Sequence, residues 1–513
     1  MGWFKELFGK KSTGATSSGM TTTSSTPATP QAIINDLTLA EQIYANNPYW
    51  LHETNPPIEG SGVGAVAAME VARLITLEAK IDIEADKVLN DVLSRYVMRN
   101  LRIEIEKGWA LGGLVMKPFF VKANATITDE GVVQEISGNL KIDFFYPGYF
   151  LIHSFDRSGE IHDIAFYTIH KDKYDYYVLE ERQIYDEIES TTTITNVVYH
   201  TKEVPRKFLW DNLGVNTVPL TTVERWANIQ PKYVFEGVNG VLCGFYKPPI
   251  ANNTDLQSPY GKSPLVRAQN AIRRVDRIEE QLDWEMDVSR ARLYIDETAY
   301  NHGRGMPSGL SKFIVRLIGN PHQKFFEKFN PNIRDESYLR VMDRRLKSLE
   351  DAIGLSHGTL SIPPQAARTA TELKVSFKRT ITTVKDNRAA LVECLNQLIY
   401  AMAVWSYPSK EIDHIKAKFL FDESIFSDPQ DRLRDLMQMQ YGGNVPKWYV
   451  NMICLSITEE EAKKLVAEAE VEKFSKIVKT PEGELARDYP GIDPIYSQFA
   501  DKLTNQGTRG EGE

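Results

Sequence analysis

The sequence GLSHGTLSIPPQAARTATELK, from Gly354 to Lys374, separates two long stretches that have the apolar spacing of helices. Before it, apolar side chains recur every three or four residues from Asp335 to Ile353. After it, a second apolar stripe runs from Leu373 to Trp405 and stops before Pro408, a residue that ends helices. The pattern therefore predicts a glycine- and proline-containing loop that projects between two long helices.

Another long helix is predicted upstream of this pair. Residues 264–290 carry apolar side chains at helical spacing among many charges, and at ~1.5 Å per residue this helix would span roughly 40 Å. Residues 293–333 are rich in turns and contain FIVRLI at Phe313–Ile318, a run typical of a strand. A small strand-containing region is therefore expected between the helices at 264–290 and 335–353.

The N-terminal half predicts helices followed by antiparallel strands. Two helical patterns lie between Gly62 and Lys107, and alternating runs at Leu140–Phe145 and Ile164–Ile169 are typical of strands. Turns are predicted at Asp129–Gly131, Ser137–Asn139 and Arg157–Gly159. Near the C-terminus, the predicted elements are a strand at Ile415–Phe421 and helices around 429–440, 446–453 and 458–478. The fold class is α+β.

Composition limits the possible functions of this 513-residue chain. Its net charge of −9 disfavours a protein that grips nucleic acid or an anionic membrane over its whole surface. Cys243, Cys394 and Cys454 are far apart, and the nine histidines are scattered, so neither a disulfide framework nor a metal site is indicated. Trp3, Phe4, Leu7 and Phe8 lie in a segment too short and polar for a signal peptide.

Three short motifs resemble enzyme signatures, and the sequence around each argues against it. Gly354–Gly358 fits GxSxG, but a nucleophile elbow needs a strand before the serine and a helix directly after it. Gly60–Ala65 fits GxGxxA without a preceding buried strand, and Gly261–Ser263 resembles the end of a phosphate loop with Leu256 where glycine is required. A serine hydrolase using Ser356 is kept as the alternative function.

Positively charged residues are concentrated at the end of the loop and in the helical pattern that follows it. From Arg368 to Arg388 the sequence has an excess of four cations over Glu372 and Asp386. A solvated helix face explains such a run as well as a polyanion path does. The cations are Arg368, Lys374, Lys378, Arg379, Lys385 and Arg388.

The order and spacing of several segments resemble one known family. The segments are ALGG at Ala110–Gly113, KPPIANNTDLQSPYGKSPLVRA at Lys247–Ala268, QLDWEMDVSRARLYID at Gln281–Asp296, the opening loop, FDESIFSD at Phe421–Asp428, and SITEEEAKK at Ser456–Lys464. From about Ala32 to Lys476 the chain resembles the portal proteins of tailed bacteriophages, of the siphophage type related to a Bacillus phage portal. None of these segments is a catalytic signature, so no enzyme activity is expected.

The resemblance implies a portal fold with a mixed α/β wing, a stem of long helices, a small α/β clip, a tunnel loop and a helical crown. The implied regions are a disordered N-terminal arm at 1–31, the wing at 32–263, stem helices at 264–292 and 334–354, the clip at 293–333, the tunnel loop at 355–368, a long wing helix and closing strand at 369–426, the crown at 427–479, and a disordered tail at 480–513.

The resemblance also implies partners and a location. The chain is expected to form a dodecameric ring with copies of itself at one capsid vertex of the virion, after assembly in the host bacterial cytoplasm. Its expected partners are double-stranded DNA, bound without sequence specificity, the terminase large subunit, the major capsid and scaffolding proteins, and a head-tail adaptor. No membrane, cofactor or metal is expected. A capsid adaptor without a channel is a further alternative.

Specific residues follow from the implied regions. The tunnel-loop candidates are Ser356, His357, Gly358, Thr359, Leu360, Ser361, Ile362, Pro363, Pro364, Gln365 and Arg368, with the two prolines stiffening the loop. The DNA-facing candidates are Arg368, Lys374, Lys378 and Arg379. The candidates for docking on the clip are Phe325, Phe326 and Phe329, although aromatic side chains of this kind equally often pack inside.

Overall fold

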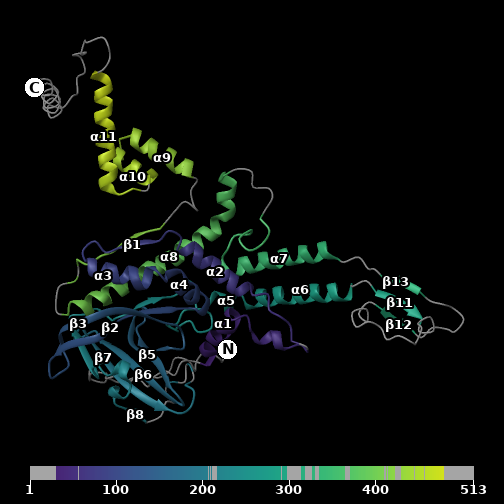
Figure 1. Cartoon of the computed structure of the whole chain (residues 1–513), viewed down its shortest axis with the longest axis horizontal. Coiled ribbons are helices and arrows are strands. Elements are labelled where there is room, and N and C mark those ends of the chain that lie inside the picture. Colours follow the sequence, from purple (N-terminus) through teal and green to yellow (C-terminus); the bar gives the residue numbers. More distant parts are fainter. Residues whose placement is uncertain are drawn as a thin grey trace, which may run out of the picture. The chain divides into compact units, whose positions relative to one another are not determined.

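A computed structural model shows how these segments are arranged (Figure 1). It describes residues 31–55, 57–205, 216–289, 334–363, 370–408, 414–421, 429–443, 445–455 and 457–478, the strands at 292–296, 314–317 and 326–329, and residues 207, 210 and 412. The chain divides into two compact units, Met1–Phe426 and Ser427–Glu513. Each unit is considered separately below.

Helices and strands are both abundant in the first unit, as the α+β class predicts. Its helices are α1 (Gln31–Tyr44), α2 (Val63–Ile75), α3 (Lys87–Val92), α4 (Leu101–Leu111), α5 (Pro264–Arg267), α6 (Gln269–Val288), α7 (Asp335–Ile353) and α8 (Ala370–Ser406), with a π-helical turn at Leu93–Met98 and short 3₁₀ turns at Tyr49–His52, Leu220–Thr222 and Glu224–Trp226.

The strands of the first unit form four sheets. The strands are β1 (Lys80–Asp82), β2 (Leu114–Ile127), β3 (Val133–Phe145), β4 (Phe150–Phe155), β5 (Ile161–Asp172), β6 (Asp175–Asp186), β7 (Thr191–Thr201), β8 (Thr217–Val218), β9 (Lys232–Glu236), β10 (Gly244–Tyr246), β11 (Arg292–Asp296), β12 (Ile314–Leu317), β13 (Phe326–Phe329) and β14 (Lys418–Leu420). Strands β4 to β7 form an antiparallel meander that continues into β8, and β9 also pairs with β7; β10-β2-β3 form a second antiparallel sheet, and β1 pairs with β14.

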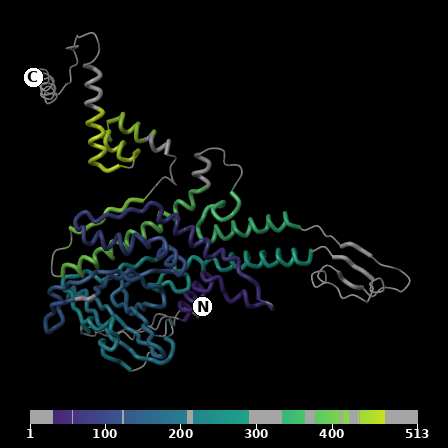
Figure 2. The backbone as a smooth tube through the Cα atoms, in the orientation of Figure 1, coloured from purple at the N-terminus to yellow at the C-terminus, as the bar shows by residue number. Residues whose placement is uncertain are grey.

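Helix α8 lies at the centre of the main core. Leu391, Leu395 and Leu398 are fully buried in the same apolar cluster as residues of α2, α4 and β2. Figure 2 shows α8 in green among these N-terminal segments, which are far away in sequence. Its part Phe377–Ser406 has the length and hydropathy of a membrane-crossing helix, yet 56% of its most apolar window is buried. These contacts make it the core helix of this unit.

The predicted turn at Ser137–Asn139 is wrong. These residues lie inside β3, and the pairing with β2 shifts between Val121/Asn139 and Asn124/Ser137. Gly138 has φ +150°, a conformation that favours glycine, and it lies opposite two residues of β2, 122 and 123. The extra residue is a β-bulge in β2, and β3 continues here without reversing direction. The turns predicted at Asp129–Gly131 and Arg157–Gly159 do connect strands, β2 to β3 and β4 to β5.

Helix α1 is absent from the predicted elements. Ile33, Leu37, Ala40 and Ile43 are buried along it at helical spacing, so the periodic signal was present. The pattern between Gly62 and Lys107 also contains more than the two predicted helices, because strand β1 and the π-helical turn interrupt it.

Helices α6 and α7 pack against each other as a charged pair (Figure 1). The chain between them contains a three-stranded sheet in which β11 pairs with β12 in parallel and with β13 antiparallel. The helix–strand–helix order predicted for residues 264–353 is confirmed, with α6 preceded by the single turn α5.

The second unit contains helices α9 (Pro429–Tyr441), α10 (Lys447–Leu455) and α11 (Glu459–Val478), as predicted. Thr458 begins α11: its hydroxyl accepts from the Glu461 backbone N–H at 3.4 Å, and Glu461 accepts in return from the Thr458 N–H at 3.1 Å. This reciprocal pair is a capping box, and Val450 and Ala462 are buried among the helices.

Candidate functional site

The loop that follows α7 begins with a glycine in the left-handed conformation. Gly354 has φ +81° and ends the helix, which an L-residue with a β-carbon does less readily. Thr383 of α8 donates its hydroxyl to the Gly354 carbonyl at 2.6 Å, and the next residue, Leu355, is fully buried. The loop therefore starts inside the core and is held by both helices.

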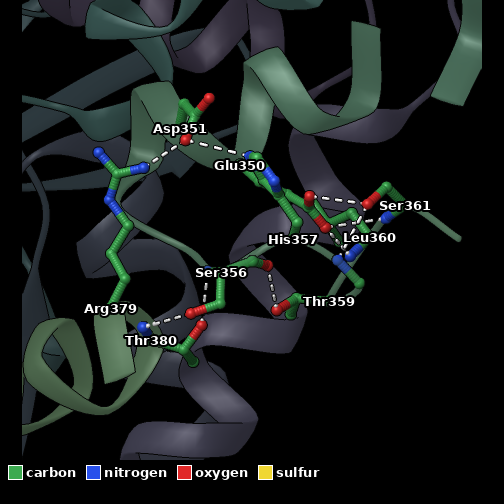
Figure 3. A network of polar contacts seen from close by, with 10 residues as sticks. Glu350, Asp351, Ser356, His357, Thr359, Leu360, Ser361, Arg379 and Thr380 are labelled. Carbon is green, nitrogen blue, oxygen red and sulfur yellow. Dashed lines mark hydrogen bonds and ion pairs between the residues drawn. The ribbon is translucent and has the colours of Figure 1, made fainter. Parts of the chain in front are cut away.

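Glu350 organises the middle of this loop (Figure 3). Its side chain lies on the last turns of α7 and is fully buried. One carboxylate oxygen accepts from the backbone N–H groups of Leu360 at 2.5 Å and Ser361 at 2.8 Å, and the other accepts from the Ser361 hydroxyl at 2.8 Å. Ser361 also accepts from the Gly358 N–H at 2.9 Å. A single carboxylate thus fixes the loop on the helix that precedes it.

Ser356 is part of the same packing and is not placed as a nucleophile. It is buried, its N–H donates to the Thr380 hydroxyl at 2.7 Å, and its own hydroxyl accepts from the Thr380 N–H at 3.1 Å. A helix precedes it and a turn follows, so the strand and helix of a nucleophile elbow are absent from this described part of the chain. His357 lies 3.2 Å from Asp351 instead. The hydrolase alternative is not supported.

Asp343 holds the outer edge of the loop. Its carboxylate accepts from the Ile362 N–H at 3.0 Å and from the Lys347 ammonium at 2.6 Å. The hydrogen bond from Lys347 holds the pKa of Asp343 below its ordinary value. Ile362 and Pro363 are exposed, whereas Leu355, Ser356 and Ser361 are buried. The described loop is therefore a folded turn from 355 to 361, and most of the second half of the predicted projecting loop, residues 364–369, lies outside the described residues.

The cations near the loop occupy different environments. Arg379 forms an ion pair with Asp351, and both side chains are about half exposed. Lys378 is exposed at the adjacent position. Arg388 is buried: its guanidinium donates to the carbonyls of Ile75 and Leu74, each at 3.0 Å. Counting Arg388 in a solvent-facing cation run was wrong, because it caps the C-terminal end of α2.

The other two enzyme-like motifs also have structural roles. Lys262 is buried, forms an ion pair with Asp36, and donates to the Thr254 hydroxyl at 2.6 Å, so it does not face a phosphate site. Asp276 of α6 accepts from the Ser61 N–H at 2.9 Å and the Ser61 hydroxyl at 2.6 Å. No group of three or more metal-ligating side chains occurs among the residues that the structure describes.

An ion pair closes the ends of α6 and α7 next to the three-stranded sheet. Arg334 donates to both carboxylate oxygens of Glu285, at 2.9 and 2.6 Å. These hydrogen bonds hold the pKa of Glu285 below its ordinary value and raise that of Arg334. Bidentate geometry makes this contact more directional than most surface pairs.

We expect this ion pair to contribute stability that depends on pH. Because the folded pKa of Glu285 is lowered, the contribution is complete above the ordinary value of 4.5 and is lost as pH falls through the lowered value. The measurement is the thermal midpoint of the wild type and of Glu285→Gln between pH 3 and 7. Their difference should be constant above about pH 5 and shrink below it. A difference that persists unchanged at pH 3 would contradict this role.

Comparison with known proteins places this geometry in a family. Residues 253–473, which contain α5 to α10, the loop and most of α11, match the family model described as phage portal protein, SPP1 Gp6-like. Over this region, a little under half of the chain, the sequence is similar to the phage portal proteins. A search of curated proteins gives no match.

This match confirms the resemblance to phage portal proteins that was drawn from the order of segments. The tunnel-loop and DNA-facing residues are not tested by the match, and Pro364, Gln365 and Arg368 lie outside the described residues. Lys374 lies on the described backbone of α8, but its side chain does not belong to the described part.

The structure describes two of the three aromatic residues that are candidates for docking on the clip. Phe326 and Phe329 are the first and last residues of strand β13, while Phe325 lies outside the described residues. The docking role of these aromatics stays a prediction.

Two residues of α7 that hold the loop, Glu350 and Asp343, are missing from the sequence-based candidates. Glu350 lies four positions after Leu346, on the apolar stripe of α7 itself. A carboxylate in a predicted buried stripe is a recognisable signal, because buried carboxylates need several hydrogen-bond donors.

Proposed function

We propose that this portal-family chain assembles into a closed ring at one capsid vertex, through which double-stranded DNA is packaged and later ejected. The observation that carries the proposal is the antiparallel pair α6 and α7, joined directly to the folded loop before α8, in a region that matches the portal family. In this proposal α6 and α7 form the stem, residues 293–333 the clip, 355–368 the tunnel loop, and 427–479 the crown.

Exposed apolar side chains on both stem helices support assembly. Trp284 is 61% exposed and Met286 52%, while Leu339 on α7 is 57% exposed. These side chains stand among charged neighbours on two adjacent helices, the mixture that a heterologous, ring-closing interface between copies can bury. A ring of twelve copies is the expected form.

A moderate attraction for DNA suits a channel through which DNA must slide. Phosphate contacts by lysine and arginine raise affinity steeply through counterion release, so a channel lined densely with cations would hold DNA. The chain has a net charge of −9, and two of the cations near the loop, Arg379 and Arg388, are engaged by other groups of the protein. In the proposal, Arg368, Lys374 and Lys378 make transient contact with the DNA.

The clip is proposed as the docking surface for the terminase large subunit during packaging and for a head-tail adaptor afterwards. Capsid and scaffolding proteins would contact the wing. Assembly in the host cytoplasm and residence at the virion vertex follow from this role.

Electron microscopy of the purified full-length chain tests the ring directly. Rings with a central hole are the expected particles. Compact particles without a hole, at every concentration tried, would overturn the channel and favour a capsid adaptor. The mass of the particles in solution gives the number of copies independently of the images.

Neutralising the loop-proximal lysines should weaken DNA retention. We expect the double substitution Lys374→Gln and Lys378→Gln to lower the fraction of heads that keep their DNA at raised salt by about twofold or more, because each lost phosphate contact lowers affinity. Lys418→Gln is the matched control, since Lys418 is exposed and pairs with Glu84 on the β1–β14 sheet. Equal retention by the double variant and wild type would refute the DNA-facing assignment.

A further inference from the structure

A groove of about 1010 Å³ lies beside α8 in the first unit. It is formed by the end of the six-stranded sheet near Ile161 and Tyr185, the segment 247–261, and the middle of α8. Its volume reaches the upper limit of small-molecule pockets, which is roughly 1,000 Å³. Apolar side chains in its lining include Val241, Phe245, Pro248, Ile250, Leu256 and Tyr260.

The chemistry of the lining fits an apolar peptide segment with positive charge. Leu256 is 86% exposed, a large apolar surface for a residue at the mouth of a groove. Glu160 and Glu393 give the rim two carboxylates, against one lysine, Lys247. Burial lowers the pKa of Lys247 while Glu393 opposes that shift, so the lysine already has an acidic neighbour.

The N-terminal arm leaves the described structure next to this groove. Helix α1 begins at Gln31, and its residues Ile33 and Leu37 pack in one cluster with the groove residues Phe245 and Tyr260. Asp36, one turn into the helix, accepts hydrogen bonds from Thr254 and Lys262 of the segment that borders the groove. Residues 1–30 therefore connect to the chain beside the groove.

The sequence of this arm contains a segment suited to the groove. Trp3, Phe4, Leu7 and Phe8 are spaced so that they would share one face of a helix, and Lys5, Lys10 and Lys11 outnumber Glu6. Residues 12–30 are nearly all serine, threonine, glycine, alanine and proline. For a linker of that length and composition the expected end-to-end distance is roughly 25 Å, which gives a tethered segment a local concentration on the order of millimolar.

We propose that residues 3–8 dock into the groove of their own chain, with the four apolar side chains covering Leu256 and its apolar neighbours. The lysines of the segment then lie within reach of Glu160 and Glu393. Docking removes from water both the exposed leucine and the four apolar side chains of the segment. This proposal does not rest on the ring or the DNA channel.

Photo-crosslinking of the full-length chain tests the docking. A benzophenone amino acid replaces Leu256, and a matched protein carries it at Tyr174, which is 88% exposed at the opposite end of the β5–β6 hairpin. We expect cross-links from position 256 to the tryptic peptides at 1–5 or 6–10, and none from position 174. They should disappear when Trp3, Phe4, Leu7 and Phe8 are all changed to serine. Cross-links from 256 only to other segments, or none, would overturn the proposal.

Isotope labelling decides which copy supplies the arm. Nitrogen-15 and unlabelled chains are mixed before assembly, and the cross-linked peptides are weighed. Pairs with the same label on both peptides are expected for docking within one chain. Pairs that mix labels in statistical proportion would show that the arm belongs to another copy and would overturn the assignment made here.

A binding measurement checks the groove without cross-linking. A fluorescent peptide of residues 1–11 is titrated with the full-length chain in which Trp3, Phe4, Leu7 and Phe8 are changed to serine. Saturable binding is expected, weakened about tenfold or more by Leu256→Glu and unchanged by Tyr174→Glu. An absence of saturable binding, or equal weakening by both substitutions, would contradict docking at this groove.

Discussion

Glu350→Ala should open the turn between α7 and α8. The substitution leaves the N–H groups of Leu360 and Ser361 without their acceptor, and each unsatisfied buried donor costs about 1–3 kcal/mol. The free energy of local opening should therefore fall by about 2–5 kcal/mol. Amide hydrogen exchange of a peptide covering residues 355–363 measures this directly, as faster exchange in the variant than in the wild type.

Two further variants make the Glu350 prediction sharper. Asp351→Ala changes the adjacent carboxylate, which is half exposed and pairs with Arg379, so exchange of the turn should change little. Glu350→Gln keeps an oxygen that can accept both N–H groups and should lose only about 1 kcal/mol. If Asp351→Ala and Glu350→Ala accelerate exchange equally, the buried carboxylate does not hold the turn.

Arg388→Met should destabilise the first unit by about 3–5 kcal/mol. The guanidinium makes two charge-assisted hydrogen bonds to the last carbonyls of α2, each worth about 1.5–3 kcal/mol, and lies 5.0 Å from the ring centre of Phe421. Methionine fills part of the space but supplies no donor. The thermal unfolding midpoint, followed by circular dichroism, should fall by roughly 5 °C or more.

Arg379→Met is the matched control for Arg388, because it is the same change on the same helix. Arg379 is about half exposed and pairs with Asp351, so its loss should cost less than about 1 kcal/mol. Arg388→Lys should be intermediate, since an ammonium cannot reproduce the planar fork that reaches two carbonyls. Similar losses for both methionine variants would show that burial does not distinguish these arginines.

The sequence predicts the long elements of this protein well because their signals are local. The stripes of α7 and α8 repeat over many turns, and Gly354 and Pro408 mark where they end. The triplet Ser137–Asn139 predicts a turn, yet the same residue types also occur opposite a β-bulge, and only the pairing with β2 decides between the two.

The environment of the candidate site is less predictable, since it depends on contacts between distant segments. The sequence shows Arg379 and Arg388 only as two positive charges on the same helix and does not indicate that one is exposed and the other buried. The carbonyls that bind Arg388 belong to residues more than 300 positions earlier. Likewise, nothing local to Ser356 shows that the Thr380 backbone will occupy its hydroxyl. The apolar spacing predicts a loop between the two helices, while the packing of that loop required the structure.

The pairing of β1 with β14 has a consequence for how the chain is made. Lys418 and its partner Glu84 are 334 positions apart, and α8 fills the core against α2. A ribosome that adds about 5–20 residues per second needs tens of seconds to cover that distance. During this time Ala67, Val71 and Ile75, all fully buried in the finished protein, have no α8 to cover them. Folding of the first unit must therefore be completed late in translation or after release. Until then the apolar face of α2 is exposed to solvent, and chaperones can bind such exposed apolar surface.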